Sequence, residues 1–255
     1  MTSNGSDPNI PSLSVVIPAH NEAPNIVPLL DEVETALRGR ISYEIVVLDD
    51  GSSDGMTDIL AAEALKRPAL RPLRHIHQSG QSAGLISGVR AARGDWIATL
   101  DGDGQNDPAD IPALWDRLRA STDPDLKMIA GHRAKRRDTW IKRMSSRIAN
   151  RVRAGLLRDE TPDTGCGLKL FERRLFLELP AFDHMHRFLP ALARRAGAHV
   201  LSVPVNHRPR GRGVSHYGLH NRLWVGIVDI VGVMWLMRRS RLPGGVEDLR
   251  GRRNP

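Results

Sequence analysis

Residues 96–108 have the sequence WIATLDGDGQNDP, in which a short apolar run ends in two aspartates. The run predicts a buried strand, so Asp101 and Asp103 would lie where that strand leaves the sheet at its carboxyl end. Two carboxylates two residues apart on a turn can direct oxygens to one point, and Mg²⁺ and Mn²⁺ prefer oxygen ligands. Such an ion could hold a diphosphate. The alternative is an Asp- and Gly-rich turn whose carboxylates only accept hydrogen bonds from nearby amides.

The chain around this segment alternates apolar, β-branched runs with helical patterns. Strands are predicted at 13–18, 43–48, 73–78, 96–100, 127–130 and 200–205. Helices are predicted at 26–37, 57–66, 82–93, 111–119 and 140–157, with a further one beginning near Arg173. This alternation favours an α/β fold with a mostly parallel, Rossmann-like sheet, right-handed crossovers and helices on both faces.

Polar clusters follow four of these regions, at 19–22, 49–54, 80–82 and 101–107. In an open parallel sheet, ligands bind outside the carboxyl ends of the strands. We therefore expect the four clusters to converge on one cleft.

Composition narrows the classes of partner. The 255 residues include 37 Lys and Arg against 29 Asp and Glu, a formal net charge of +8. This excess predicts phosphates, anionic lipid or nucleic acid as neighbours. With only two Tyr and four Phe, a base-stacking surface is a poor fit, so we expect no nucleic-acid partner. The single Cys166 excludes an internal disulfide framework and a thiolate zinc cluster, and suits a reducing cytosol.

The chain length suits one large domain with a C-terminal appendage. We expect a disordered lead-in at 1–11, an α/β domain at 12–219, a helix at 220–241 and a flexible tail at 242–255. The polar lead-in lacks the apolar core of a secretory signal.

The predicted C-terminal helix is apolar from Leu223 to Met237 except for Asp229, and Arg238 and Arg239 follow it directly. With Trp near both ends, it suits a helix half-buried in a membrane interface. The alternative is a helix that packs on the sheet. No stretch reaches the ~20 apolar residues needed to span a bilayer, so we expect a cytoplasmic protein, peripheral on the inner face of the membrane.

Four motifs stand in order along the chain: PAHNE at 18–22, DDGSSDG at 49–55, DGDGQNDP at 101–108 and GCGLKLF at 165–171. Together they resemble the family 2 glycosyltransferases, and most of all the branch of dolichol-phosphate mannose synthases and undecaprenyl-phosphate glycosyltransferases. The resemblance covers roughly residues 12–240. It implies a GT-A fold, a nucleotide-sugar donor, Mg²⁺ or Mn²⁺, and inverting transfer of the sugar to a lipid phosphate.

The resemblance also implies roles for residues on the donor side. Nucleotide-sugar contacts fall on Pro18, His20, Glu22, Asp49, Asp50, Gly80 and Gln81, and metal ligands on Asp101, Asp103 and Gln105. Asp101, Asp103 and Arg210 are the expected catalytic residues, with Arg210 in a loop that closes over the diphosphate. That loop has His216 where the family has a lysine, so its charge would depend on pH. Asp49 and Asp50 could instead cap the turn that follows them.

On the acceptor side, the basic stretch 131–147 resembles the site that binds the acceptor phosphate. Arg133, Lys142, Arg143 and Ser146 fall on or beside the matching positions. Arginine forks match phosphate oxygens in pairs, but the stretch could also be a solvated helix face or rest on anionic lipid. His186 and Arg187 could line the sugar pocket or take a packing role.

The leading hypothesis is transfer of mannose or a related hexose from a GDP- or UDP-sugar to dolichyl or undecaprenyl phosphate. A lipid phosphate is already an anion, so a strong general base is dispensable. The alternative is a glycosyltransferase that acts on a hydroxyl in polysaccharide or cell-envelope synthesis; it would need a carboxylate base, for which Asp163 is the candidate. A basic nucleic-acid-binding protein is a third, disfavoured hypothesis. The sugar, the base, the lipid length and the oligomeric state stay open.

Overall fold

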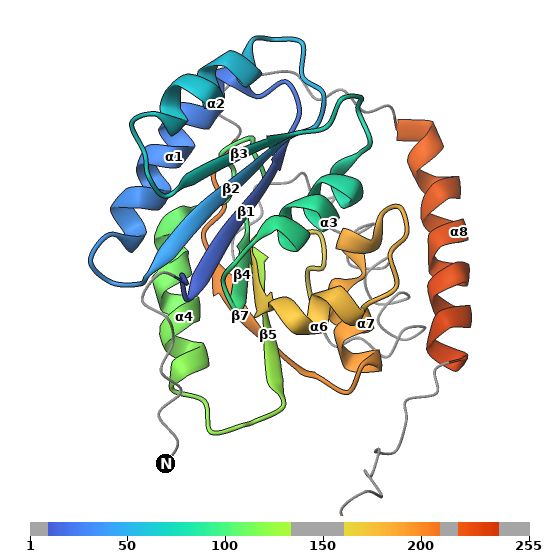
Figure 1. The fold of residues 1–255 in the computed structure, drawn as a ribbon. Helices are drawn as coiled ribbons and strands as arrows, with labels where there is room; N and C mark the ends of the chain where they lie inside the picture. The colour runs from blue at the N-terminus through green and yellow to red at the C-terminus, as the bar shows by residue number, and fades with distance from the viewer. Residues whose placement is uncertain (1–9, 134–160, 210–218, 240–255) are drawn as a thin grey trace, which may run out of the picture.

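Figure 1 shows the computed structural model of the chain, which describes residues 10–133, 161–209 and 219–239. The strands are β1 Leu13–Ala19, β2 Tyr43–Asp49, β3 Leu70–Arg74, β4 Trp96–Thr99, β5 Leu126–Arg133, β6 Lys169–Glu172 and β7 His199–Val205. The α-helices are α1 Ala23–Leu37, α2 Met56–Ala64, α3 Gln81–Ala91, α4 Ile111–Arg119, α6 Arg173–Glu178, α7 Leu189–Arg195 and α8 Leu219–Arg238. Two short 3-10 helices, η1 Pro108–Asp110 and η2 Met185–Arg187, complete the described elements.

The strands form one sheet in the order β3-β2-β1-β4-β6-β5-β7. Strand β6 runs antiparallel to both of its neighbours, whereas the other pairings are parallel. The expected α/β fold with a mostly parallel sheet is therefore confirmed. Because β1, β2 and β4 are parallel neighbours, the segments that follow them emerge at the same edge of the sheet.

Helices cover both faces of this sheet, as the near-continuous apolar strands require. One buried cluster joins the sheet to α1, α2 and α4, and a second joins it to α3, α6, α7 and α8 (Figure 1). Helix α3 approaches the sheet closely because it presents glycines to it. A Cβ at Gly88 would lie 2.5 Å from a methyl carbon of Val16. This approach places the amino end of α3 over the carboxyl ends of β1 and β2.

The third strand differs from the prediction of 73–78. Strand β3 begins at Leu70, where it pairs with Ile45, and ends at Arg74 opposite Asp49. It contains Pro72, which lacks an amide donor but is tolerated because β3 is the edge strand. Residues 75–80 form a loop instead, and this loop contacts the end of β2.

Helix α8 packs through one face on the second buried cluster. Val233 is buried there, and the residues packed beside it are Ile230, Met234 and Met237. The guanidinium of Arg195 also donates to the carbonyl of Leu236 (3.1 Å). The packing alternative for this helix is thus realised on its inner face.

The outer face of α8 is apolar as well. Val228, Val231 and Trp235 are each at least 60% exposed and stand three to four residues apart, so they share one side of the helix. No helix among the described residues has the combination of length and apolar character that crossing a bilayer needs.

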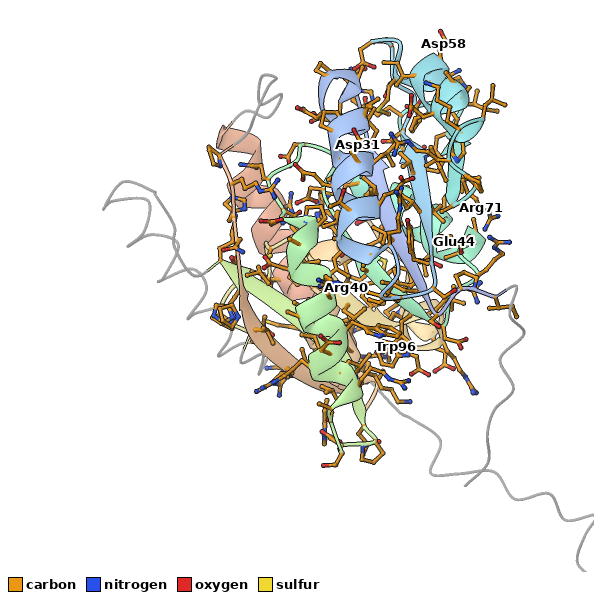
Figure 2. All side chains as sticks on the ribbon, turned by 90° about the vertical axis from the view of Figure 1, so that its left-hand side faces the viewer. Asp31, Arg40, Glu44, Asp58, Arg71 and Trp96 are labelled. Atoms are coloured by element: carbon orange, nitrogen blue, oxygen red, sulfur yellow. The ribbon has the colours of Figure 1, made fainter. Side chains whose placement is uncertain are left out.

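At the amino edge of the sheet, Glu44 of β2 lies beside Arg71 (Figure 2). Its carboxylate is fully buried. Its Oε1 accepts hydrogen bonds from Ser14 Oγ (2.7 Å) and the Arg93 amide (2.6 Å), and its Oε2 accepts from Arg71 and Arg93 (both 3.0 Å). Burial alone would raise the pKa of Glu44, but these hydrogen bonds outweigh it and lower that pKa. The charge is fully satisfied inside the fold.

Candidate functional site

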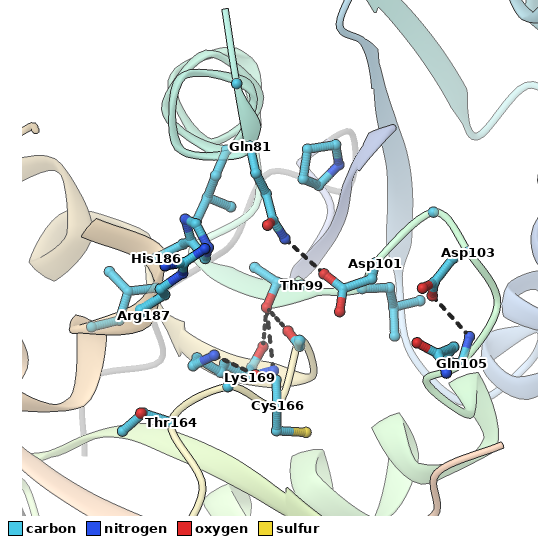
Figure 3. Close-up of a pocket in the computed structure, with 18 of the residues that line it drawn as sticks. Gln81, Thr99, Asp101, Asp103, Gln105, Thr164, Cys166, Lys169, His186 and Arg187 are labelled. Atoms are coloured by element: carbon cyan, nitrogen blue, oxygen red, sulfur yellow. Dashed lines mark hydrogen bonds between the residues drawn. The ribbon is translucent and has the colours of Figure 1, made fainter. Parts of the chain in front are cut away.

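A cleft of about 890 Å³ opens at the carboxyl edge of the sheet. Its walls come from the segments after β1, β2 and β4, from the start of α3, from residues 163–169, from η2 and from α8. The expected convergence of the polar clusters is therefore found in space. Figure 3 shows part of this cleft, with Thr99 near the centre, Asp101 to its right, Gln81 above and Lys169 below.

The two aspartates after β4 both line the cleft. Asp101 Oδ1 accepts a hydrogen bond from Gln81 Nε2 (2.8 Å), while Asp103 Oδ1 accepts one from the Gln105 amide (3.1 Å). The protein atoms that enclose Asp101, and then the negative charge of Asp103, raise the pKa of Asp101 to about 6. Two carboxylates in mutual repulsion suit a site that gains a cation.

These residues fit a divalent ion by the chemistry of their donors. Asp101, Asp103 and Gln105 offer oxygen ligands on one turn, as the sequence predicted. No cluster of three or more His, Cys, Asp or Glu residues able to hold a metal occurs in the part of the chain that the structure describes. An ion bound here would therefore need further oxygens from its ligand, as a diphosphate could provide.

Close packing fixes the position of the Asp101 carboxylate. A methyl group on Gly167 would overlap with that carboxylate and with the side chain of Asn106. The amide of Asp101 donates to Asn106 Oδ1 (3.0 Å), and Thr99 Oγ1 donates to the Gly167 carbonyl (2.6 Å). Gly167, the second glycine of the GCGLKLF motif, is thus needed because no side chain fits beside Asp101.

The expected nucleotide side of the cleft is formed by the loop after β1. Pro18, His20 and Glu22 all line the cleft. His20 Nδ1 lies 2.8 Å from the carbonyl oxygen of Asp50, and Glu22 Oε2 accepts from the Asn25 side chain (2.6 Å). The His20 contact holds the loop against the end of β2, and the Glu22 contact joins it to α1. The role of the loop with a nucleotide stays a prediction.

Asp49 and Asp50 have different roles in the fold. Asp49 Oδ1 accepts from the Ser52 amide (2.8 Å), and its other oxygen accepts from Thr57, so this carboxylate stabilises the turn before α2. Asp50 lines the cleft, and its carboxylate accepts from the amides of Ser79 and Gly80 (both 2.8 Å). The capping alternative therefore describes Asp49. A nucleotide contact stays a prediction that suits Asp50 better.

Gly80 and Gln81 mark the junction of the β3 loop with α3. Gly80 has φ +91°, a region that favours glycine, and directly precedes the helix. The Asp50 contacts above hold this junction, and Gln81 then reaches Asp101. Both residues line the cleft, as predicted.

On the opposite wall, Arg133 makes a two-pronged ion pair with Asp163. Arg133 Nε donates to Oδ2 (2.6 Å) and Nη2 donates to Oδ1 (2.8 Å). Both residues line the cleft. The other residues expected at the acceptor phosphate or the closing loop lie outside the described residues: Lys142, Arg143, Ser146, Arg210 and His216.

Lys169 was not expected as a site residue. It is the first residue of strand β6, is only 4% exposed, lines the cleft and donates from Nζ to the Cys166 carbonyl. Burial lowers the pKa of Lys169, whereas the negative charges of Asp101 and Asp163 act in the opposite direction. The signal for Lys169 that the sequence offered was its position as the single charged residue in residues 165–171.

The remaining wall is built by η2 and α8. Burial, reinforced by the nearby charge of Lys169, lowers the pKa of His186 to about 3, so its ring is neutral. Its Nδ1 lies 2.7 Å from Ser82 Oγ. His186 and Arg187 line the cleft (Figure 3), as do Asp229 and Ile230 of α8. Asp229 had appeared in the sequence only as an interruption of an apolar helix.

Comparison with known proteins agrees with this geometry. Residues 14–179 match the model of the family described as Glycosyl transferase family 2. The chain belongs to this family. It is 34% identical to dodecaprenyl-phosphate galacturonate synthase of Rhizobium johnstonii, over 91% of this chain and 69% of that protein. It is 31% identical to undecaprenyl-phosphate 4-deoxy-4-formamido-L-arabinose transferase of Aeromonas hydrophila, over 83% of this chain and 64% of that protein.

The family expected from the four motifs is thus confirmed, and the names of these relatives agree with the polyprenyl-phosphate branch. The chain spans about two thirds of the length of the curated relatives it matches, 69% and 64% in these two cases.

Solved structures confirm the GT-A fold. A mannosyltransferase from Pyrobaculum calidifontis in complex with GDP-Man and Mn²⁺ superimposes with a TM-score of 0.65 at 22% identity, over 92% of this chain and 67% of that chain. Glucosyl-3-phosphoglycerate synthase from Mycobacterium tuberculosis, in complex with Mn²⁺, UDP and phosphoglyceric acid, gives a TM-score of 0.66 at 18% identity, over 92% and 81%.

Proposed function

We propose that this glycosyltransferase transfers a hexosyl group from a GDP- or UDP-sugar to a polyprenyl phosphate, with inversion at the anomeric carbon. A bond forms between an acceptor phosphate oxygen and the anomeric carbon, and the bond from that carbon to the nucleoside diphosphate breaks. The names of the relatives, which print dodecaprenyl phosphate and undecaprenyl phosphate, support the acceptor class. Those names print galacturonate and a formamido-arabinose, so they do not favour mannose.

The observation that supports this acceptor best is the Arg133–Asp163 ion pair. A hydroxyl acceptor needs a carboxylate to remove its proton, and Asp163 was the candidate. Both oxygens of Asp163 accept hydrogen bonds from Arg133, so this carboxylate is already engaged in an ion pair. A phosphate needs no such base, and Lys169 offers it a positive charge within the cleft.

On the donor side, Asp101, Asp103 and Gln105 would hold Mg²⁺ or Mn²⁺. The ion would act as a Lewis acid that stabilises the leaving diphosphate. Gln81 orients the Asp101 carboxylate through its 2.8 Å hydrogen bond. The loop at 18–22 and the Asp50 region would hold the nucleoside, which leaves the wall of Lys169, His186 and α8 for the sugar and the acceptor.

The outer face of α8 would place this cleft at a membrane. Val228, Val231 and Trp235 are exposed and apolar, and Arg238 and Arg239 are exposed beside them. Such a face can enter the headgroup region while the arginines attract anionic lipid. We place the protein on the cytoplasmic side, peripheral on the inner face of the membrane.

A liposome assay tests this placement. The double variant Val231→Asp, Trp235→Asp should lose sedimentation with anionic vesicles and keep its melting temperature, because the inner face of α8 is untouched. Equal sedimentation of wild type and variant would contradict the placement. Truncation before α8 is a poorer test, since it would uncover the buried side of Val233.

The activity itself is tested with the full chain, Mn²⁺ or Mg²⁺, a panel of GDP- and UDP-sugars and a short-chain polyprenyl phosphate. Mass spectrometry should detect a hexosyl polyprenyl phosphate, and NMR of the product should show the anomeric configuration opposite to that of the donor. The matched control is the corresponding polyprenol, which lacks the phosphate. Glycosylation of the polyprenol, or of no lipid with any donor, would overturn the proposal.

A further inference from the structure

Asp229 is the one charged residue between Leu223 and Met237. A helix that only packs on a core, or only rests on a membrane, has no need for such a residue, and a carboxylate in either place is unfavourable. Asp229 also lies beyond residues 14–179, which match the family model. Its presence in α8 therefore calls for a reason specific to this part of the chain.

The surroundings of Asp229 leave it incompletely satisfied. Its side chain is 15% exposed, and Oδ2 lies 2.9 Å from Nδ1 of His184. That contact lacks the alignment of a hydrogen bond, and Oδ2 is buried without a hydrogen-bond partner among the described residues. Since Oδ2 is buried beside His184, Oδ1 is the polar atom of this side chain that can meet a ligand.

The charges around the cleft indicate which part of a substrate would meet Asp229. Phosphate oxygens are repelled by a carboxylate, and the positive charge of Lys169 suits them better, whereas the charge of Arg133 is paired with Asp163. The nucleoside is expected at the loop after β1, on the far side of Asp101 from the wall formed by η2 and α8. A hexosyl group that extends from the diphosphate towards this wall would bring its hydroxyls there, and hydroxyls donate charge-assisted hydrogen bonds to a carboxylate.

We propose that Asp229 is a specificity-determining residue that accepts a hydrogen bond from a hydroxyl of the donor's hexosyl group. The C-terminal helix then has two functions: its outer face contacts the membrane and its inner face recognises the sugar. This proposal rests on the proposed function only for the nucleotide-sugar donor, and it does not depend on the acceptor. If the hexosyl group is a uronate, Asp229 repels its carboxylate. The hydroxyl that binds Asp229 then lies on a part of the ring away from that carboxylate.

Calorimetric binding without acceptor tests the proposal separately from the transfer reaction. The probes are UDP, GDP, UDP-glucose, UDP-galactose, UDP-glucuronate and GDP-mannose, each with Mn²⁺. The best-bound sugar nucleotide should bind wild type more tightly than its nucleotide does. In Asp229→Asn that sugar nucleotide should bind about 10- to 100-fold more weakly, the size expected for a hydrogen bond to a charged group. UDP or GDP alone should bind the variant as it binds wild type.

Asp183→Asn is the matched control. Asp183 also approaches His184, with Oδ2 3.5 Å from Nε2, but its side chain is 73% exposed and lies outside the cleft wall described above. This variant should bind all probes like wild type. A purely structural role for Asp229 would instead lower the melting temperature and weaken UDP or GDP together with the sugar nucleotide, and that result would overturn the proposal.

A second measurement uses unaltered protein, in case Asp229→Asn folds poorly. Deoxy analogues of the best-bound sugar nucleotide, each lacking one hydroxyl, should include one that binds wild type about 10- to 100-fold more weakly. In a folded Asp229→Asn variant, the difference in affinity between that analogue and its parent should be clearly smaller than in wild type, because the hydrogen bond to a charged group is lost. Uniform affinity for all the analogues, or a panel in which no sugar adds affinity over its nucleotide, would overturn the proposal even if transfer to polyprenyl phosphate is observed.

Discussion

Glu44 and Asp101 are carboxylates at opposite edges of the same sheet, and the fold treats them in opposite ways. Four hydrogen bonds from Ser14, Arg71 and Arg93 satisfy Glu44 and lower its pKa. Asp101 accepts one side-chain hydrogen bond, from Gln81, and enclosure together with Asp103 raises its pKa to about 6. The charge of Glu44 is satisfied within the fold, whereas the charge of Asp101 is left for a ligand to satisfy.

The same contrast extends to whole edges of the sheet. At the amino edge, charged groups neutralise one another. At the carboxyl edge, Asp101, Lys169 and Asp229 each lack a full partner in the described part of the chain. Perturbed and under-satisfied charges gather at functional sites, because a ligand completes them. We therefore expect the incompletely paired charges at the carboxyl edge to lower the stability of the fold and to be needed for activity there.

The largest expected effect is on transfer, from Asp101→Asn or Asp103→Asn. Each change removes a charged ligand from the expected metal site, and activity should fall by at least about 10²- to 10³-fold, as when a preorganised group that stabilises developing charge is lost. In the presence of chelator the melting temperature should stay constant or rise, because like-charge repulsion is removed. Full transfer activity of either variant with chelator present would refute the metal assignment.

The second largest effect on transfer is expected from Lys169→Met. The change removes a buried positive charge whose described partner is a backbone carbonyl, so transfer should fall by about 10²-fold while stability is kept or improved. Steady-state kinetics and a thermal melt measure both effects on the same preparation. A variant that unfolds while an equally buried apolar change, Leu168→Met, does not would place Lys169 with Glu44 as a structural charge.

The sequence predicted the fold and much of the cleft for a local reason. Apolar periodicity located β1, β2, β4 and β7, and the rule for carboxyl ends of parallel strands then brought distant clusters together. The 2.8 Å contact between Gln81 and Asp101, twenty residues apart, is one result.

What the sequence could not predict depends on tertiary pairing. Strand β3 is displaced because its register follows β2 and an edge position tolerates Pro72. The ion pair of Arg133 with Asp163, thirty residues away, was not predicted, whereas the role of Arg133 at the acceptor phosphate stays a prediction. The proximity of Asp229 to His184 arises only when α8 folds back over η2. Lys169 and Asp229 are each a lone charge in an apolar run. Such a charge indicates a site residue, but an interpretation based on apolar periodicity does not use it.

Glu44→Gln should show the reverse of the Asp101 result. The change weakens hydrogen bonds from Ser14 and from the Arg93 amide to a buried charge, so the free energy of unfolding should fall by about 1–3 kcal/mol. Transfer activity measured well below the melting temperature should stay within about threefold of wild type, since Glu44 lies at the far edge from the cleft. Chemical denaturation provides the stability, and a large loss of activity in a folded variant would show that the two edges are coupled.

The smallest expected effect is the pH dependence of that stability difference. The folded-state pKa of Glu44 is lower than the ordinary value of 4.5, so its contribution is fully present above that pH. The contribution is lost as the pH falls through the folded-state pKa, because the unfolded chain then takes up the proton first. Denaturation of wild type and Glu44→Gln at several values between about pH 3 and pH 7 should therefore give a gap that is constant near neutrality and narrows in acid, by about 1.4 kcal/mol for each unit by which folding lowers the pKa. A gap that does not change with pH would mean that neutral hydrogen bonds, rather than the charge of Glu44, stabilise the amino edge.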